Sequence, residues 1–185
     1  MSIELVSLSD LKTMLDIQTT KNDAKLTLIR DGVTATIEQF IGRELEFKTR
    51  TEKISVGIHF KRMISLKALP VDDIGSITLQ YNTDTESETL SENDYTITDY
   101  GVELGYGVKN CQLTIEYDGG YFAADVPSQI GRAALLQTCF EFNSSVNVGA
   151  TSVSNSGGSV RYPNFRLLFE CRQILESLKH PFMLV

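Results

Sequence analysis

The sequence predicts an α+β protein: a small bundle of about four helices with an antiparallel β-sheet inserted between the second and third helices. Three observations predict this fold. Apolar residues recur at helical spacing near both ends of the chain. Between residues 46 and 118 the spacing changes to the alternation that is typical of strands. Helical spacing then returns at 125–143, so we expect one helical core that the sheet interrupts.

Length and composition indicate a globular protein with a real core. The 185 residues, of which 42% are hydrophobic and 22% charged, suit a single domain that spans 1–185. Lys and Arg number 17 against 24 Asp and Glu, and the net charge of −7 argues against a protein that grips nucleic acid phosphates. The acidic start of the chain does not resemble a signal peptide, and its apolar runs are too short for a membrane span. We therefore expect the protein to be made in the cytoplasm.

The N-terminal segment 1–45 is expected to form a pair of helices. Ser7 and Asp10 have the spacing of a capping box, which predicts a short first helix that ends near Ile17. Gly42 is expected to end the second helix in a left-handed conformation. The apolar stripe of this second helix consists of Leu26, Ile29, Val33, Ile37, Phe40 and Ile41.

The segment 46–118 is expected to form the inserted antiparallel sheet. Ile77–Tyr81 and Leu113–Tyr117 alternate as strands do, and Asp99–Gly101 indicates a turn. Asn82–Glu88 is acidic and predicts an exposed hairpin tip, for which plain solvation is the favoured interpretation. Aromatic residues are expected to pack between sheet and helices. The alternative is a stacking platform for single-stranded nucleic acid, which would need a basic groove beside these residues. These residues are Tyr95, Tyr100, Tyr106, Tyr117, Tyr121 and Phe122.

The last third of the chain predicts two helices that a long loop separates. Pro127 suits the start of the third helix. The apolar positions of this helix are spread around most of its circumference, which predicts a central place in the bundle. Residues 144–163 are rich in Ser and Gly, so Ser144–Arg161 is expected to be a functional or disordered loop. Residues 164–185 are expected to form the final helix, which begins near Asn164 and ends before Pro181, and an apolar tail.

The sequence predicts no catalytic residue, no cofactor and no metal ligand. His59 and His180 lie apart from any partner at metal-ligand spacing, and the three cysteines are expected to be buried. The acidic residues are expected in turns and hairpin tips, and Gly105–Gly107 is expected to be a turn because a nucleotide-binding loop needs a third glycine and a following helix. A small hydrolase that pairs Cys139 or Cys171 with a histidine remains an alternative without a supporting signature.

Three ordered stretches carry a resemblance that covers about three quarters of the chain. They are Leu8–Lys12 with Glu38–Leu45; Ile64–Val71 with Ile74–Leu79 and Asp94–Ile97; and Ile115–Tyr121 with Val126–Ile130 and Ala133–Phe142. In this order they resemble the head-tail connector family of tailed bacteriophages, in particular HK97-type adaptors with a β insertion. The chain departs from that family at its end, where an apolar tail replaces an arginine-rich segment.

The resemblance implies a structural virion protein and no enzyme. We expect a dodecameric ring in the neck that joins the portal protein to a stopper or tail-completion protein, without any role at a membrane. DNA would pass through its channel without specific binding, and the ring would be assembled in the host cytoplasm. The alternative is that the chain is itself a tail terminator or tail-completion protein.

Two groups of residues are the expected contact sites. The candidates for contact with the portal or another partner are Arg161, Tyr162, Phe165, Arg166, Arg172, Phe182, Met183, Leu184 and Val185. The candidates for a loop that faces a neighbour or the tail are Asn147, Val148, Ser154 and Asn155.

Overall fold

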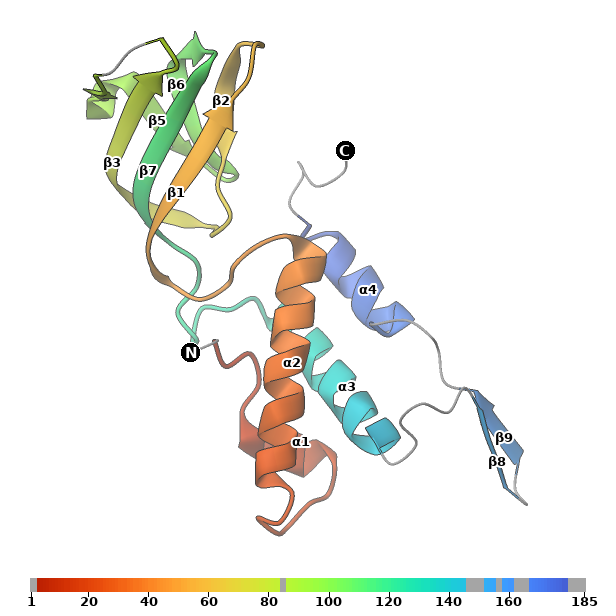
Figure 1. Ribbon diagram of the computed structural model, residues 1–185. Coiled ribbons are helices and arrows are strands. Elements are labelled where there is room, and N and C mark those ends of the chain that lie inside the picture. Colours follow the sequence, from red (N-terminus) through yellow and green to blue (C-terminus); the bar gives the residue numbers. More distant parts are fainter. Residues whose placement is uncertain (1–2, 84–85, 146–151, 156–157, 162–166, 180–185) are drawn as a thin grey trace. The chain divides into compact units, whose positions relative to one another are not determined.

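The computed structural model describes residues 3–83, 86–145, 152–155, 158–161 and 167–179 (Figure 1). Its elements follow one another as α1 (Leu8–Met14), α2 (Asp23–Ile41), β1 (Lys48–Val56), β2 (Lys61–Ser65), β3 (Val71–Tyr81), β4 (Glu88–Thr89), the 3₁₀ turn η1 (Glu92–Asp94), β5 (Tyr95–Thr98), β6 (Gly101–Val108), β7 (Cys111–Gly119), α3 (Ser128–Ser144), β8 (Ser152–Asn155), β9 (Gly158–Arg161) and α4 (Phe169–Glu176). The predicted α+β class and the insertion of the sheet strands between α2 and α3 are confirmed.

The described chain divides into two compact units. Residues up to 41 and from 126 to 179 form a helical unit, and residues 42–125 form a sheet unit. Because both ends of the insertion return to the helical unit, the order of elements agrees with a helical core that a β segment interrupts. None of the helices in the described ranges is long and apolar enough to span a membrane.

Local capping chemistry defines the first two helices. The Ser7 Oγ accepts a hydrogen bond from the backbone N–H of Asp10 at 3.1 Å, and the Ser7 hydroxyl donates to the Asp10 carboxylate at 2.6 Å. α1 ends at Met14, three residues before the expected Ile17. Gly42 follows α2 with φ of 69°, the predicted left-handed conformation.

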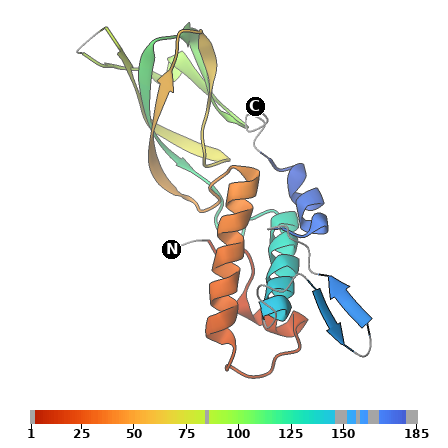
Figure 2. The same cartoon turned by 45° about the vertical axis from the view of Figure 1, so that its right-hand side comes forward.

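α3 is the central helix of the helical unit, as its apolar pattern predicts. It packs against α1, α2 and α4, and Figure 2 shows it beside α2. The buried Gln137 on α3 accepts a hydrogen bond from the Leu168 N–H at 2.8 Å, which ties the start of α4 to α3. The final helix was expected to begin near Asn164 and to include Leu167 and Leu168. The structure corrects this: α4 begins at Phe169, and the backbone of Leu168 is extended.

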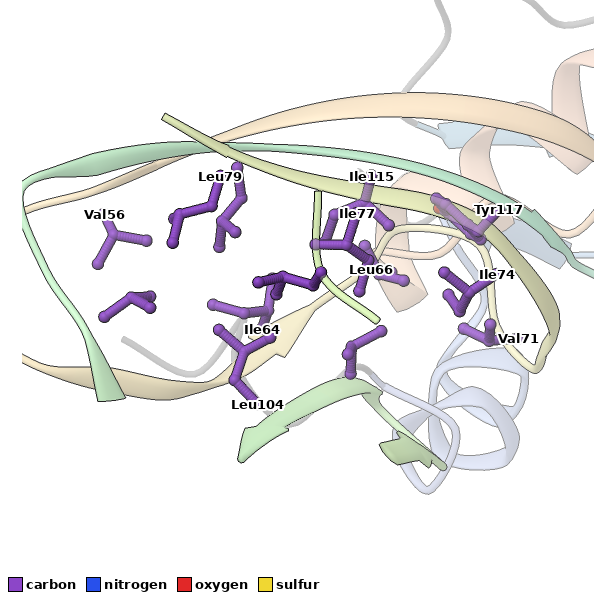
Figure 3. Packing of buried hydrophobic residues seen from close by; sticks show 14 of the residues in the cluster. Val56, Ile64, Leu66, Val71, Ile74, Ile77, Leu79, Leu104, Ile115 and Tyr117 are labelled. Carbon is purple, nitrogen blue, oxygen red and sulfur yellow. The ribbon is translucent and has the colours of Figure 1, made fainter. Parts of the chain in front are cut away.

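The sheet unit consists of two antiparallel sheets. One has the strand order β1-β7-β3-β4 and the other β2-β6-β5. The hydrophobic core lies between them, with inward residues such as Ile64, Ile77, Leu104 and Ile115 in contact (Figure 3). Tyr117 therefore packs between the two sheets, where it was expected between the sheet and the helices, because the second sheet covers the apolar face of the first.

Exposure of the aromatic residues follows from this arrangement. Tyr117 points inward from β7 and is fully buried. Tyr100 and Tyr106 are each 41% exposed, and Phe122 is 57% exposed. Most of the aromatic residues expected in the core therefore lie at its rim or on the surface.

Three further expectations are corrected by backbone pairing. Gly105–Gly107 lies within β6 and is not a turn, and Asp72 and Asp73 lie in β3 and not in a turn. The segment expected as a loop from Ser144 to Arg161 contains the antiparallel hairpin of β8 and β9. Its Ser and Gly content suggested a loop, but four residue pairs between Ser152 and Arg161 form a ladder.

Candidate functional site

The nucleophilic and metal-binding side chains are separated in the described part of the chain. No group of three or more His, Cys, Asp or Glu residues there could hold a metal ion. Cys111, Cys139 and Cys171 are free and buried, as predicted, and burial is the main cause that raises the pKa of each thiol. The Cys171 thiol donates a hydrogen bond to the Ala133 carbonyl at 3.4 Å. His59 is exposed in the turn after β1, and His180 lies outside the described residues.

One predicted partner contact, Arg172, lies on the surface of α4. Its guanidinium carbon is 5.7 Å from the centre of the Phe40 ring, and the Lys179 Nζ is 4.4 Å from the same ring. Cation–π attraction thus places two positive charges of the C-terminal segment over one aromatic side chain of α2. The Lys179 Nζ also pairs with the Glu176 carboxylate at 2.8 Å, which balances its charge, and Arg172 is exposed on the surface of α4.

The remaining predicted contacts lie in the hairpin or beyond the described residues. Arg161 pairs with Ser152 across the β8–β9 hairpin, Ser154 pairs with Ser159, and Asn155 lies at its turn opposite Gly158. The other candidates lie outside the described ranges: Asn147, Val148, Tyr162, Phe165, Arg166, Phe182, Met183, Leu184 and Val185. Their roles as contacts stay predictions.

An exposed apolar pair on the sheet unit was missed in the sequence. Ile58 and Phe60 lie in the turn between β1 and β2 and are 72% and 68% exposed. The Lys109 Nζ lies 4.5 Å from the centre of the Phe60 ring. Two large apolar residues beside a glycine in a turn were the available signal, because neighbouring exposed apolar side chains can form a patch that marks an interaction surface.

Backbone hydrogen bonds join the turns at this end of the sheet unit. The Asn110 N–H donates to the Gly57 carbonyl at 2.8 Å, and the Asn82 N–H donates to the Asn110 carbonyl at 3.0 Å. Asn110 has φ of 49°, a conformation that Asn tolerates better than most residues. These hydrogen bonds join the turns after β1, β3 and β6. The exposed Ile58 and Phe60 therefore lie beside a turn that is hydrogen-bonded to its neighbour.

Charges are segregated within the sheet unit. Residues 68–108 contain no Lys or Arg. They contain nine acidic residues: Asp72, Asp73, Asp84, Glu86, Glu88, Glu92, Asp94, Asp99 and Glu103. Exposed basic residues lie instead on β1, on β2, in the connection that follows β2 and in the turn after β6: Lys48, Lys53, Lys61, Arg62, Lys67 and Lys109. β2 carries only basic charges and β3, β4 and β6 carry only acidic ones, while β1 carries Glu52 besides its three basic residues.

A buried arginine anchors the opposite end of the sheet unit. Arg50 is 9% exposed and its guanidinium donates to the Glu44 carboxylate at 2.9 Å. It also donates to the carbonyls of Lys48, Gly119 and Glu46 at 3.0, 2.9 and 2.8 Å. One side chain therefore joins the strand that enters the unit to the strand that leaves it.

The comparisons with known proteins identify the family. The family model described as head completion protein matches residues 4–180. The chain belongs to the head completion protein family. This confirms the expected membership of a head-tail connector family, and it assigns the protein a structural role in completing a particle head.

Solved structures show the same fold over nearly the whole chain. This head completion protein is similar to a chain in the neck of an empty GTA particle computed with C6 symmetry, with a TM-score of 0.60, 14% identity and coverage of 92% of this chain and 87% of that chain. It is also similar to a chain in the virion of the native gene transfer agent (GTA) particle, with a TM-score of 0.59, 13% identity and the same coverage. A chain in the neck of the native GTA particle computed with C12 symmetry gives a TM-score of 0.56, 13% identity and coverage of 93% and 87%. Comparison with curated protein sequences found no match.

Proposed function

We propose that this head completion protein forms a homo-oligomeric ring in the neck of a phage-like particle, between the portal protein and the stopper or tail. The family match over residues 4–180 carries the proposal. A fold shared over 92% of the chain with a protein from the neck of a GTA particle supports it. The functional surfaces would then be contacts with neighbours, and a catalytic pocket is not needed.

The charge of the chain suits a wall of a DNA channel. The net charge of −7 would repel the phosphate backbone and let DNA pass through without specific binding. A dodecamer is the ring that the resemblance to the adaptors implies. Assembly would take place in the host cytoplasm, where particles of this kind are built.

We assign the portal contact to the C-terminal part of the helical unit. Arg172 supplies an exposed positive charge on the surface of α4, whereas the charge of the neighbouring Lys179 is paired with Glu176 at 2.8 Å. The proposed contact also includes Arg161, Tyr162, Phe165, Arg166, Phe182, Met183, Leu184 and Val185. The segment with Asn147, Val148, Ser154 and Asn155 would face a neighbouring subunit or the tail-side protein.

Electron microscopy of the purified chain with its portal protein tests the position. A coaxial ring on the portal is the expected result. A chain that ignores the portal and binds the tail tube would contradict it, and would favour a tail terminator or tail-completion protein. A pull-down against portal and tube proteins separates these outcomes.

A pair of charge reversals tests the portal contact. Arg172→Glu should weaken capture by the portal, because it removes one positive charge from the surface of α4 and adds a negative one. Arg132→Glu makes the same change on the exposed side of α3 and serves as the matched control. Equal capture of both variants would contradict the assignment of α4 to the portal.

A further inference from the structure

We infer that copies of this chain join through opposite edges of the sheet unit, so that the basic edge of one copy binds the acidic edge of the next. The basic edge is defined as β1, β2 and the turns that carry Phe60 and Lys109. The acidic edge is defined as β4, η1, β5 and the turn that carries Tyr100. The inference rests on the proposed homo-oligomeric ring and names the surfaces that would build it.

The topology places these two surfaces on opposite sides of the unit. β1 and β4 are the outer strands of the first sheet, and β2 and β5 are the outer strands of the second. A short turn joins β1 to β2, and η1 leads from β4 into β5. Each side of the two-layered unit therefore consists of one edge strand from each sheet and the segment that connects them.

The two edges carry opposite charge. Lys53 and Lys61 are exposed on the basic edge, where Lys109 lies over Phe60. On the acidic edge Glu88 and Glu92 are exposed. Complementary potentials attract unlike edges, and like charges oppose the pairing of two identical edges. The charge pattern thus selects a second copy of the same chain in a head-to-tail arrangement.

Apolar side chains accompany the charges on both edges. Ile58 and Phe60 are 72% and 68% exposed on the basic edge. Ile97 and Tyr100 are 40% and 41% exposed on the acidic edge. Contact between the edges would remove these apolar side chains from water. Their burial would add a favourable hydrophobic contribution to the free energy of association, besides the attraction between opposite charges. A contact between two different patches repeats from copy to copy and forms a closed ring when the rotation between copies closes.

Two double variants of the full-length chain test the pairing. Lys53→Glu/Lys61→Glu makes both edges acidic, and Glu88→Lys/Glu92→Lys makes both edges basic. Self-association, measured by sedimentation velocity at low ionic strength, should weaken roughly a hundredfold in each variant, because like charges would then face each other across the contact. A mixture of the two variants should recover assemblies that contain both in equal amounts.

Non-specific charge effects predict a different pattern. The first variant raises the magnitude of the net charge from −7 to −11 and the second lowers it to −3, since each Lys–Glu exchange changes the charge by two. General repulsion would therefore weaken only the first variant, whereas edge pairing weakens both. Lys21→Glu in the helical unit and Glu116→Lys on the central strand β7 are exposed single-charge controls that should leave association unchanged.

The outcomes separate the inference from the proposed ring. Wild-type assemblies that persist in both double variants would overturn the edge pairing and leave the ring intact. Failure of the mixture to recover assembly would also overturn the pairing. A wild-type chain that stays monomeric in solution and with its portal would overturn the ring itself, and the edge pairing with it.

Discussion

The buried hydroxyl of Tyr117 donates a hydrogen bond to the Glu52 carboxylate. The same Tyr117 oxygen accepts a hydrogen bond from the backbone N–H of Ala68 at 3.1 Å, and Glu52 accepts another from the N–H of Lys67 at 3.0 Å. These bonds join β7, β1 and the connection between β2 and β3. They close the end of the core between the two sheets.

Removal of the Tyr117 hydroxyl should destabilise the protein. Tyr117→Phe keeps the ring but leaves the Ala68 N–H without its partner, so we expect a loss of about 1–3 kcal/mol in the free energy of unfolding. Guanidinium denaturation measures this change. Tyr100→Phe, at a side chain 41% exposed, is the matched control and should change stability by less than about 0.5 kcal/mol. Equal effects of the two variants would show that the Tyr117 hydrogen bonds do not stabilise the fold.

The same hydroxyl should make the protein sensitive to alkaline pH. Burial, followed by the hydrogen bond to Glu52, raises the pKa of Tyr117 in the folded state. Between the ordinary tyrosine pKa of about 10 and this raised pKa, the unfolded chain binds fewer protons than the folded chain, so stability falls as pH rises. Unfolding curves at a series of alkaline pH values should show a shallower fall for Tyr117→Phe. An unchanged slope would contradict this assignment.

Arg50 should tolerate no conservative replacement. Its planar guanidinium serves the Glu44 carboxylate and three backbone carbonyls, whereas a lysine ammonium is a single point charge that cannot hold all four positions. Arg50→Lys should lower the free energy of unfolding by about 1–3 kcal/mol through carbonyls that lose their partner. Lys48→Arg, at an exposed position at the start of the same strand, should have little effect. Chemical denaturation of both variants is the measurement.

Two glycines should respond to alanine in opposite directions. A Cβ at Gly120, which has φ of 106°, would lie 2.5 Å from the Glu46 carbonyl oxygen, so Gly120→Ala should destabilise by about 1–3 kcal/mol. Gly32 lies within α2, and a Cβ there meets no atom within 4 Å. Gly32→Ala should therefore stabilise by about 0.5–1 kcal/mol. Thermal unfolding compares the two, and effects of the same sign would contradict the geometry.

The three cysteines should resist alkylation in the folded protein. Burial raises the pKa of each thiol, so little reactive thiolate is present near neutral pH, and the core shields the sulfur atoms. Mass spectrometry after treatment with iodoacetamide should find no modification in buffer and three modifications in denaturant. Rapid modification of Cys139 or Cys171 in buffer would instead support the alternative of a hydrolase with a cysteine nucleophile. A variant without cysteines that still assembles would argue against that alternative.

Local sequence patterns predicted the helices and strands, but not which of their side chains are buried by packing against other elements. The cap at Ser7 and the left-handed Gly42 were predictable because their partners lie within a few residues. The exposure of Tyr106 was not, because it depends on a second sheet whose strands pair across long stretches of chain. The β8–β9 hairpin was missed because only one of its four residue pairs, Val153 with Val160, is apolar, which leaves no alternating apolar signal.

The sequence by itself determined the α+β class, the place of the insertion and the excess of acid between residues 68 and 108. These properties depend on composition and on spacing along the chain. Only the tertiary structure decided that β1 lies at one edge of its sheet and β4 at the other, because β7 pairs with both β1 and β3. That long-range pairing separates the basic residues from the acidic ones in space and thereby creates two edges that can recognise each other.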